Sequence, residues 1–202
     1  MPILFKSEYL KQDVFIWQLS ETEEQLQALV PKETIPDYSF PSRRLTWLGA
    51  RCLLNTMYQS TPLLTYNKHG KPEVDNNDHI SISHSGNLVT IARSNNVCGI
   101  DIQQKSEKIA KILPKFLNEE ELIWLNTKNQ TNDYHHLIWC AKEAIFKVYG
   151  FDVDFKKDIS ILDFNIQKSG KFEAKVSRNE ETNVFTLAYQ LLGEYYLVFT
   201  HE

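Results

Sequence analysis

The sequence predicts an α+β protein built from two similar lobes, each a long helix packed on a mainly antiparallel sheet. Each half of the chain contains one long helical pattern, at about residues 43–58 and 134–149. Each pattern is followed by at least three strand-like segments separated by polar turns. We therefore expect an N-terminal lobe over residues 1–103, a C-terminal lobe over residues 104–202, and an active site in the cleft between them.

In the N-terminal half, Ser20 and Glu23 have the spacing of a capping box for a helix that ends near Val30. A loop with three prolines follows, and Ser42 is the expected N-cap of the long helix that comes next. A turn is expected at residues 66–72, around Gly70. The strands expected in this half cover residues 14–19, 80–83, 88–92 and 97–102.

In the C-terminal half, Asn118 and Glu121 predict a second capping box, for a helix through Leu125. A short helical pattern precedes it, at residues 106–113. The long helix of this half ends before Gly150, which is typical of a helix C-cap. The strands expected after it cover residues 161–167, 171–176, 184–191 and 195–200.

The helix at residues 134–149 is apolar nearly all round. Opposite its main apolar face, two aromatic residues, Trp139 and Phe146, alternate with three charged residues, Lys142, Glu143 and Lys147. Charges in such surroundings are costly unless they are paired. One interpretation is an ion pair between Glu143 and Lys147 on a half-exposed helix, worth only about 0.3–0.5 kcal/mol. The other is a site where these charges meet a charged ligand.

Composition narrows the class of protein. Hydrophobic residues make up 42% of the chain and charged residues 24%, and the net charge of −4 argues against general nucleic-acid binding. The three cysteines, Cys52, Cys98 and Cys140, lie in apolar contexts that favour buried free thiols in a reducing compartment. The first residues lack a signal-peptide pattern, and no apolar run reaches the ~20 residues that span a bilayer. We expect a soluble cytoplasmic protein without membrane contact.

Two carboxylates from separate elements are candidate ligands of Mg²⁺. Asp101 follows a glycine near the end of a predicted strand, and Glu143 lies on the aromatic-flanked side of the long helix. Such a pair is the minimal protein contribution to a magnesium site that water and substrate phosphates complete. Lys142 and Lys147 would then meet phosphate oxygens. The alternative for Asp101 is a turn-capping aspartate.

Four motifs, in order, resemble those of the 4′-phosphopantetheinyl transferases. Val97–Asp101 (VCGID) and Trp139–Lys147 (WCAKEAIFK) are similar to the two-part signature of that family. Gly70–Pro72 (GKP) and Ile82–Ser85 (ISHS) resemble two further family motifs. The length and two-lobed layout resemble the Sfp-type members, which are monomeric pseudodimers.

The resemblance implies roles for the acidic and basic residues of the signature. Asp101 and Glu143 match the magnesium ligands of the family, and Lys142 and Lys147 match lysines near the pyrophosphate of coenzyme A. Many Sfp-type members place a third acidic ligand two residues after the aspartate. Here that residue is Gln103, whose neutral carbonyl oxygen leaves the site with one negative charge fewer.

The resemblance also implies contacts to the nucleotide of coenzyme A. His84, with Ser83, matches the histidine that contacts the 3′-phosphate, and Lys71 matches a lysine beside the nucleotide. Thr46 lies in a helix segment that contributes nucleotide contacts in relatives. The phosphate ligand in that segment is expected to be Arg44, with the alternatives Arg43 and Arg51.

The activity implied is Mg²⁺-dependent transfer of the 4′-phosphopantetheine arm from coenzyme A to a serine of an apo acyl or peptidyl carrier protein. Glu121 matches a family glutamate proposed as the general base, and its alternative role is in the capping box with Asn118. Two other functions stay open: a non-catalytic module that binds coenzyme A or a carrier protein, and a metal-dependent phosphohydrolase.

Overall fold

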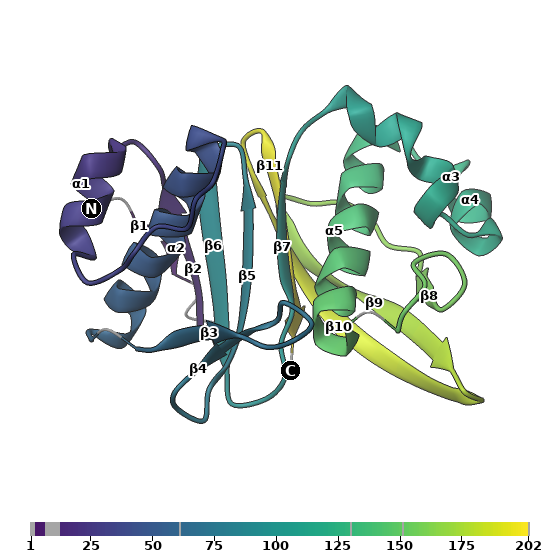
Figure 1. The fold of residues 1–202 in the computed structure, drawn as a ribbon. Helices are drawn as coiled ribbons and strands as arrows, with labels where there is room; N and C mark the ends of the chain where they lie inside the picture. Colours follow the sequence, from purple (N-terminus) through teal and green to yellow (C-terminus); the bar gives the residue numbers. More distant parts are fainter. Residues whose placement is uncertain (1–2, 7–12, 61, 130, 151, 202) are drawn as a thin grey trace. The chain divides into compact units, whose positions relative to one another are not determined.

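The computed structural model divides the chain into two compact units, unit 1 (residues 1–97) and unit 2 (residues 98–202). It describes residues 3–6, 13–60, 62–129, 131–150 and 152–201. Each unit contains helices and an antiparallel sheet, which confirms the predicted α+β class (Figure 1). The division falls between Val97 and Cys98, earlier in the chain than the expected boundary after Gln103.

The described residues of unit 1 form a four-stranded antiparallel sheet, a two-stranded hairpin and two helices (Figure 1). The strand order in the sheet is β1-β2-β6-β5, and β3 pairs with β4. The elements are β1 (Ile3–Lys6), β2 (Asp13–Gln18), α1 (Glu23–Leu29), α2 (Pro41–Tyr58), β3 (Leu64–Tyr66), β4 (Pro72–Val74), β5 (His79–Ser85) and β6 (Leu88–Ser94). The sequence patterns do not identify β1, β3 or β4 as strands.

Both helix starts predicted in unit 1 are wrong by a few residues. The capping box of α1 is formed by Thr22 and Gln25. Ser20 does not cap the helix, and its backbone N–H donates to Glu21 Oε2 at 3.0 Å. The long helix α2 begins at Pro41, one residue before the predicted cap Ser42. Proline is suited to the first position of a helix because the N–H that it lacks would have no partner there.

Unit 2 contains a five-stranded antiparallel sheet with the strand order β7-β11-β10-β9-β8. Its longest helix, α5, packs against β7 and β11 (Figure 1). The elements are β7 (Ile100–Gln104), a 3₁₀ helix (Glu107–Lys111), α3 (Leu113–Phe116), α4 (Glu119–Leu125), α5 (Thr131–Tyr149), β8 (Ile159–Ile161), β9 (Ser169–Arg178), β10 (Glu181–Leu192) and β11 (Tyr195–His201).

The strand predicted at residues 161–167 is wrong. Strand β8 ends at Ile161. Two backbone N–H groups that a continued strand would offer to a neighbour are taken by tyrosine hydroxyls instead. Ile166 donates to Tyr134 Oη at 3.4 Å, and Gln167 donates to Tyr189 Oη at 2.8 Å. Side-chain acceptors far away in the sequence therefore replace the sheet ladder here.

The capping signals of unit 2 are confirmed. Asn118 and Glu121 form the predicted capping box of α4. Gly150, just after α5, has φ +89°, and its N–H donates to Phe146 O at 2.6 Å. A positive φ at this position is accessible to glycine without steric cost.

Among the described residues, none of the helices combines the length and apolar character that crossing a bilayer requires.

A buried histidine connects the first turn of α5 to the chain that follows β7. His136 is fully buried, its Nε2 accepts from Ser106 N at 3.0 Å, and its Nδ1 lies 2.8 Å from Asn132 O. Its ring stacks on Tyr196 with centroids 4.6 Å apart. The two contacts need a neutral ring that donates from Nδ1 and accepts at Nε2.

This histidine is expected to make the stability of unit 2 depend on pH. Burial lowers the pKa of His136, and the neighbouring Lys105 lowers it further, against the raising effects of the Asn132 carbonyl and Asp133. Below the unfolded pKa of about 6.5, the unfolded chain binds a proton that the folded chain resists. The contribution of His136 to stability should therefore be full above about pH 6.5 and fall as the pH decreases below it.

Urea unfolding between pH 5 and 7.5 measures this effect. His136→Gln should be less stable than wild type at pH 7.5. The slope of its free energy of unfolding against pH should be smaller than that of wild type by up to about 1.4 kcal/mol per pH unit. His69→Gln, at an exposed position in unit 1, is the matched control and should keep that slope. Equal slopes for wild type and His136→Gln would contradict the assignment.

Candidate functional site

Strand β7 and helix α5 bring two of the predicted site residues into contact. Lys147 Nζ donates to Asp101 Oδ1 at 2.8 Å and to Ile100 O at 2.7 Å. The Asp101 residue is only 6% exposed. Lys147 therefore pairs with the strand aspartate, and the surface pair between Lys147 and Glu143 is not the arrangement found. Asp101 is likewise a residue of a regular strand and does not cap a turn.

Glu143 lies one helical turn before Lys147 and is partly buried. Burial, together with the negative charge of Asp101, raises the pKa of Glu143 to about 7 against the opposing effect of Lys147. The two carboxylates thus interact electrostatically, and one ammonium balances only one of them. Two hard oxygen donors with an excess of negative charge are a suitable partial ligand set for a divalent cation such as Mg²⁺.

No group of three or more histidine, cysteine, aspartate or glutamate side chains in the described part of the chain has the arrangement of a metal site. A cation at Asp101 and Glu143 would need further oxygen ligands from elsewhere. Gln103 lies two residues after Asp101 on β7, so its side chain is on the same face of the strand. It is partly exposed, and its Nε2 lies 3.4 Å from Gln104 O.

Gly99 permits the close approach of the two elements that carry these carboxylates. A Cβ atom at this position would lie 1.9 Å from Ala144 O and 2.8 Å from Ala144 C, both backbone atoms of α5. Gly99 N also donates to Thr200 Oγ1 at 3.0 Å, and its carbonyl accepts from Thr200 N at 2.9 Å. The sequence marks this glycine only as part of a motif, and its packing role appears once α5 is placed.

Cys140 lies beside the same site. It is fully buried, and its Sγ is 3.6 Å from Tyr196 O. Burial raises the pKa of the Cys140 thiol well above its usual value, and the charge of Asp101 raises it further. The thiol is therefore neutral and adds no negative charge to the carboxylates. All three described cysteines are buried and free, as their apolar contexts predict.

Two other predicted site residues lie in the core of unit 2. The side chains of Lys142 and Glu121 are fully buried, and Lys142 Nζ meets Glu121 Oε2 at 2.8 Å. The next residue after Lys142 is Glu143, but the side chains of consecutive helical residues point about 100° apart. The structure therefore separates Lys142 from the group of Asp101, Glu143 and Lys147.

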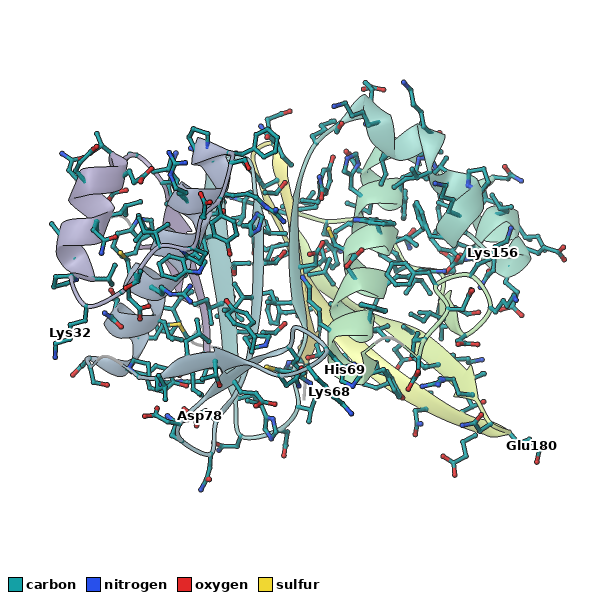
Figure 2. All side chains as sticks on the ribbon, in the orientation of Figure 1. Lys32, Lys68, His69, Asp78, Lys156 and Glu180 are labelled. Atoms are coloured by element: carbon teal, nitrogen blue, oxygen red, sulfur yellow. The ribbon has the colours of Figure 1, made fainter. Side chains whose placement is uncertain are left out.

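In unit 1, Lys71 follows a tight turn and precedes β4. Gly70 has φ +76° and donates from its N–H to Asn67 O at 2.9 Å, which confirms the predicted turn. Lys68 and His69 lie on this turn (Figure 2). Lys71 also lines an open cavity of about 490 Å³ together with residues of β4, β5 and the loop between them.

Ser83 and His84 are neighbours on β5, so their side chains point to opposite faces of the sheet. Ser83 is 6% exposed, whereas His84 is exposed. The two side chains are therefore not presented on one face, and His84 is the more accessible of the pair.

The three arginines of α2 differ in their surroundings. Arg44 Nε pairs with Glu23 Oε2 at 2.7 Å, and the buried Arg51 pairs with Glu33 at 3.1 Å. Arg43 is exposed, and its guanidinium carbon lies 5.6 Å from the centre of the Tyr38 ring. Thr46 is partly buried, and its hydroxyl lies 3.1 Å from the backbone carbonyls of Ser42 and Arg43.

A protein-family model matches the region of the chain that carries this site. The family model described as the 4′-phosphopantetheinyl transferase superfamily matches residues 97–200, more than half of the chain. The 4′-phosphopantetheinyl transferase gsp of Aneurinibacillus migulanus is 41% identical over 90 residues. The 4′-phosphopantetheinyl transferase Sfp of Bacillus subtilis strain 168 is 28% identical over 107 residues, and the transferase ffp of Bacillus subtilis is 32% identical over 87 residues.

These alignments are partial on both sides. They cover 44% of this chain and 38% of gsp, 50% of this chain and 48% of Sfp, and 41% of this chain and 39% of ffp. The chain thus spans at most about half the length of these curated relatives.

Proposed function

This chain belongs to the 4′-phosphopantetheinyl transferase superfamily, and we propose from this premise that it is an enzyme that modifies carrier proteins. It would transfer the 4′-phosphopantetheine arm of coenzyme A to a serine of an apo acyl or peptidyl carrier protein. The observation that carries the proposal is the group of Asp101, Glu143 and Lys147 between β7 and α5, inside the matched region.

In the proposed reaction, the serine oxygen bonds to the phosphorus that bears the pantetheine arm. The bond from that phosphorus to the bridging oxygen of the diphosphate breaks, and adenosine 3′,5′-bisphosphate leaves with the electron pair. The serine proton passes to a base. Negative charge grows on the bridging oxygen as the bond breaks, so fixed positive charge beside it lowers the barrier.

We assign the binding of Mg²⁺ to Asp101 and Glu143, with Gln103 contributing a neutral oxygen directly or through water. Bound there, the ion would neutralise charge on the diphosphate. Lys147 supplies a fixed positive charge, and its bonds to Asp101 and to Ile100 O hold that charge in place. The partial burial of Glu143 strengthens these electrostatic interactions because less water screens them.

We assign the nucleotide of coenzyme A to residues of unit 1. His84 is exposed and Lys71 lines an open cavity, which supports contacts of both with phosphate or base. Arg43 replaces Arg44 as the phosphate ligand in this assignment, because Arg44 and Arg51 are already engaged by glutamates. Thr46 lies on the same helix segment. The antiparallel sheet and long helix in each unit support a chain of two similar lobes, and we propose that the enzyme is a monomer.

Intact-mass measurement tests the proposal. The protein is incubated with coenzyme A, Mg²⁺ and a panel of apo carrier proteins from fatty acid, polyketide and peptide synthesis. A transferase adds the mass of one phosphopantetheine arm to at least one carrier. Binding of coenzyme A in calorimetry with no mass gain on any carrier would indicate a binding module. Breakdown of coenzyme A without a carrier would indicate a phosphohydrolase.

Replacing Gln103 tests its part in the site. Gln103→Glu adds a carboxylate on the face of β7 that carries Asp101, so the magnesium concentration for half-maximal rate should fall. The shift should also appear in direct Mn²⁺ binding. Gln104→Glu, on the opposite face of the strand, adds the same charge as a control. Equal shifts for both variants, or none for Gln103→Glu, would remove Gln103 from the coordination shell.

A further inference from the structure

The ion pair between Glu121 and Lys142 is the most deeply buried charge pair in the described part of unit 2. Both side chains have 0% exposure, and Nζ and Oε2 lie 2.8 Å apart. Glu121 is the third residue of α4, and Lys142 lies on α5. Two charges are held away from water only where their hydrogen bonds are satisfied.

The carboxylate of Glu121 is fully engaged within the protein. Its Oε2 accepts from Lys142 and from Asn118 N at 2.9 Å, while its Oε1 accepts from Ile161 N at 2.9 Å. A general base must come within hydrogen-bond reach of the proton that it removes, directly or through one water. A fully buried carboxylate whose two oxygens bind three internal donors does not offer that reach.

The ammonium of Lys142 is engaged in the same way. Besides Glu121, it lies within 2.6–2.9 Å of three backbone carbonyl oxygens, those of Phe116, Phe155 and Ile159. An ammonium has three protons, so these acceptors use all of its donor capacity. Burial lowers the pKa of Lys142 and raises the pKa of Glu121, and the opposite charge of each partner counters the shift of the other.

The carbonyls come from segments far apart in the sequence. Phe116 ends α3, Ile159 begins β8, and Phe155 lies in the loop between α5 and β8. Lys156, in the same loop, is exposed (Figure 2). Its Nζ donates to Pro114 O at 3.2 Å. The Glu121–Lys142 pair therefore joins α3, α4, β8 and this loop to one position on α5.

We propose that Glu121 and Lys142 are positioning residues that fix the rotation of α5 about its axis and so hold Glu143 toward Asp101. Glu143 directly follows Lys142, so locking Lys142 into the core sets the direction in which Glu143 points. This inference rests on the proposed function and deepens it. The proton of the carrier serine goes to a group other than Glu121, and the diphosphate meets Lys147 and not Lys142.

Three variants test this role: Lys142→Met, Glu121→Gln and the double variant. Lys142→Met leaves the Glu121 carboxylate without its positively charged partner and removes the ammonium from three backbone carbonyls. The melting temperature should therefore fall by about 10 °C. In the double variant, the glutamine oxygen can accept a backbone N–H, and its amide can donate to a freed carbonyl. The melting temperature of the double variant should therefore recover most of the decrease caused by Lys142→Met. Lys156→Met is the control, and its melting temperature should stay within about 2 °C of wild type.

Mn²⁺ binding and transfer kinetics, measured where all variants are folded, separate positioning from direct contact. Lys142→Met should bind Mn²⁺ about tenfold more weakly, as expected when a group that supports a metal ligand is lost. The double variant should recover this affinity and keep kcat within about tenfold of wild type, with the wild-type pH profile. Loss of a general base would instead cost about 10²–10⁴-fold in kcat.

The proposal is overturned if the double variant is as unstable as Lys142→Met. It is also overturned if the double variant is stable but loses transfer 10²-fold or more, or shows a raised KM for coenzyme A. Melting temperature and Mn²⁺ binding are measured without a carrier protein. If wild type modifies no carrier, the proposed function fails, and these two measurements still decide the role of the pair.

Discussion

Glu143→Gln is expected to lower the rate of carrier modification by at least about 10²–10³-fold, the range for losing one electrostatic contact to a transition state. Glutamine has nearly the same size, but it lacks the charge that binds a divalent cation. The fold should not suffer, because the repulsion between Glu143 and Asp101 disappears with the charge. A melting temperature equal to or above that of wild type should therefore accompany the loss of activity.

The rate is measured by intact mass of the carrier with saturating coenzyme A. Glu173→Gln makes the same chemical change at an exposed position on β9 and serves as the control. Asp101→Asn should lose activity to a similar extent. It should also be less stable, because Lys147 loses the charged partner that it has in the wild type. Near-normal rates for Glu143→Gln would remove this residue from the proposed site.

Gly99→Ala is expected to have the second large effect, on stability as well as on activity. The new Cβ would lie 1.9 Å from the backbone carbonyl oxygen of Ala144, which no side-chain rotation can relieve. Strand β7 and helix α5 would have to move apart, and the hydrogen bonds between Gly99 and Thr200 would weaken. We expect unit 2 to lose about 3 kcal/mol of stability, at the upper end of typical overpacking costs.

The same movement separates Asp101 from the residues of α5, so the transfer rate should fall at least about 10²-fold. Gly49→Ala in unit 1 is the matched control. There, the nearest atom to an added Cβ is Leu19 Cδ2 at 2.6 Å, the end of a flexible side chain. Urea unfolding and the carrier assay measure both effects. A Gly99→Ala variant with wild-type stability would show that the close approach of β7 and α5 is not needed.

The sequence predicts the parts of this fold that depend on local signals. Asn118 and Glu121 have the spacing of a capping box, and Gly150 follows the last residue of α5, so both helix ends are confirmed. The prediction of a strand at residues 161–167 is wrong because two backbone N–H groups of this segment bond to the hydroxyls of Tyr134 and Tyr189. Both tyrosines lie more than twenty residues away in the sequence. Local patterns carry no record of such distant acceptors.

The sequence predicts the candidate site in part. It indicates Asp101, Glu143 and Lys147, but it does not reveal that Lys147 binds Asp101. Helix α5 is apolar nearly all round, so the pattern does not show which of its charged residues faces the core. One signal is present: Lys142 shares a helical stripe with the fully buried Ile138 and Ile145, at the spacing i, i+4, i+7.

Glu121 gives the same signal on α4. It lies one helical turn before Leu125, and both residues are buried. A charged residue that continues an apolar stripe is expected to have an internal partner. Two such residues of opposite charge in one unit are natural candidates to pair with each other, as Glu121 and Lys142 do in the structure.

Direct measurement of Mn²⁺ binding, by electron paramagnetic resonance with coenzyme A present, tests the central claim that Asp101 and Glu143 hold one divalent cation. Wild type should bind one Mn²⁺ per chain. Asp101→Asn and Glu143→Gln should each weaken binding by at least about tenfold. Glu173→Gln should bind like wild type. Unchanged Mn²⁺ affinity in both site variants would contradict the claim, and with it the proposed magnesium site.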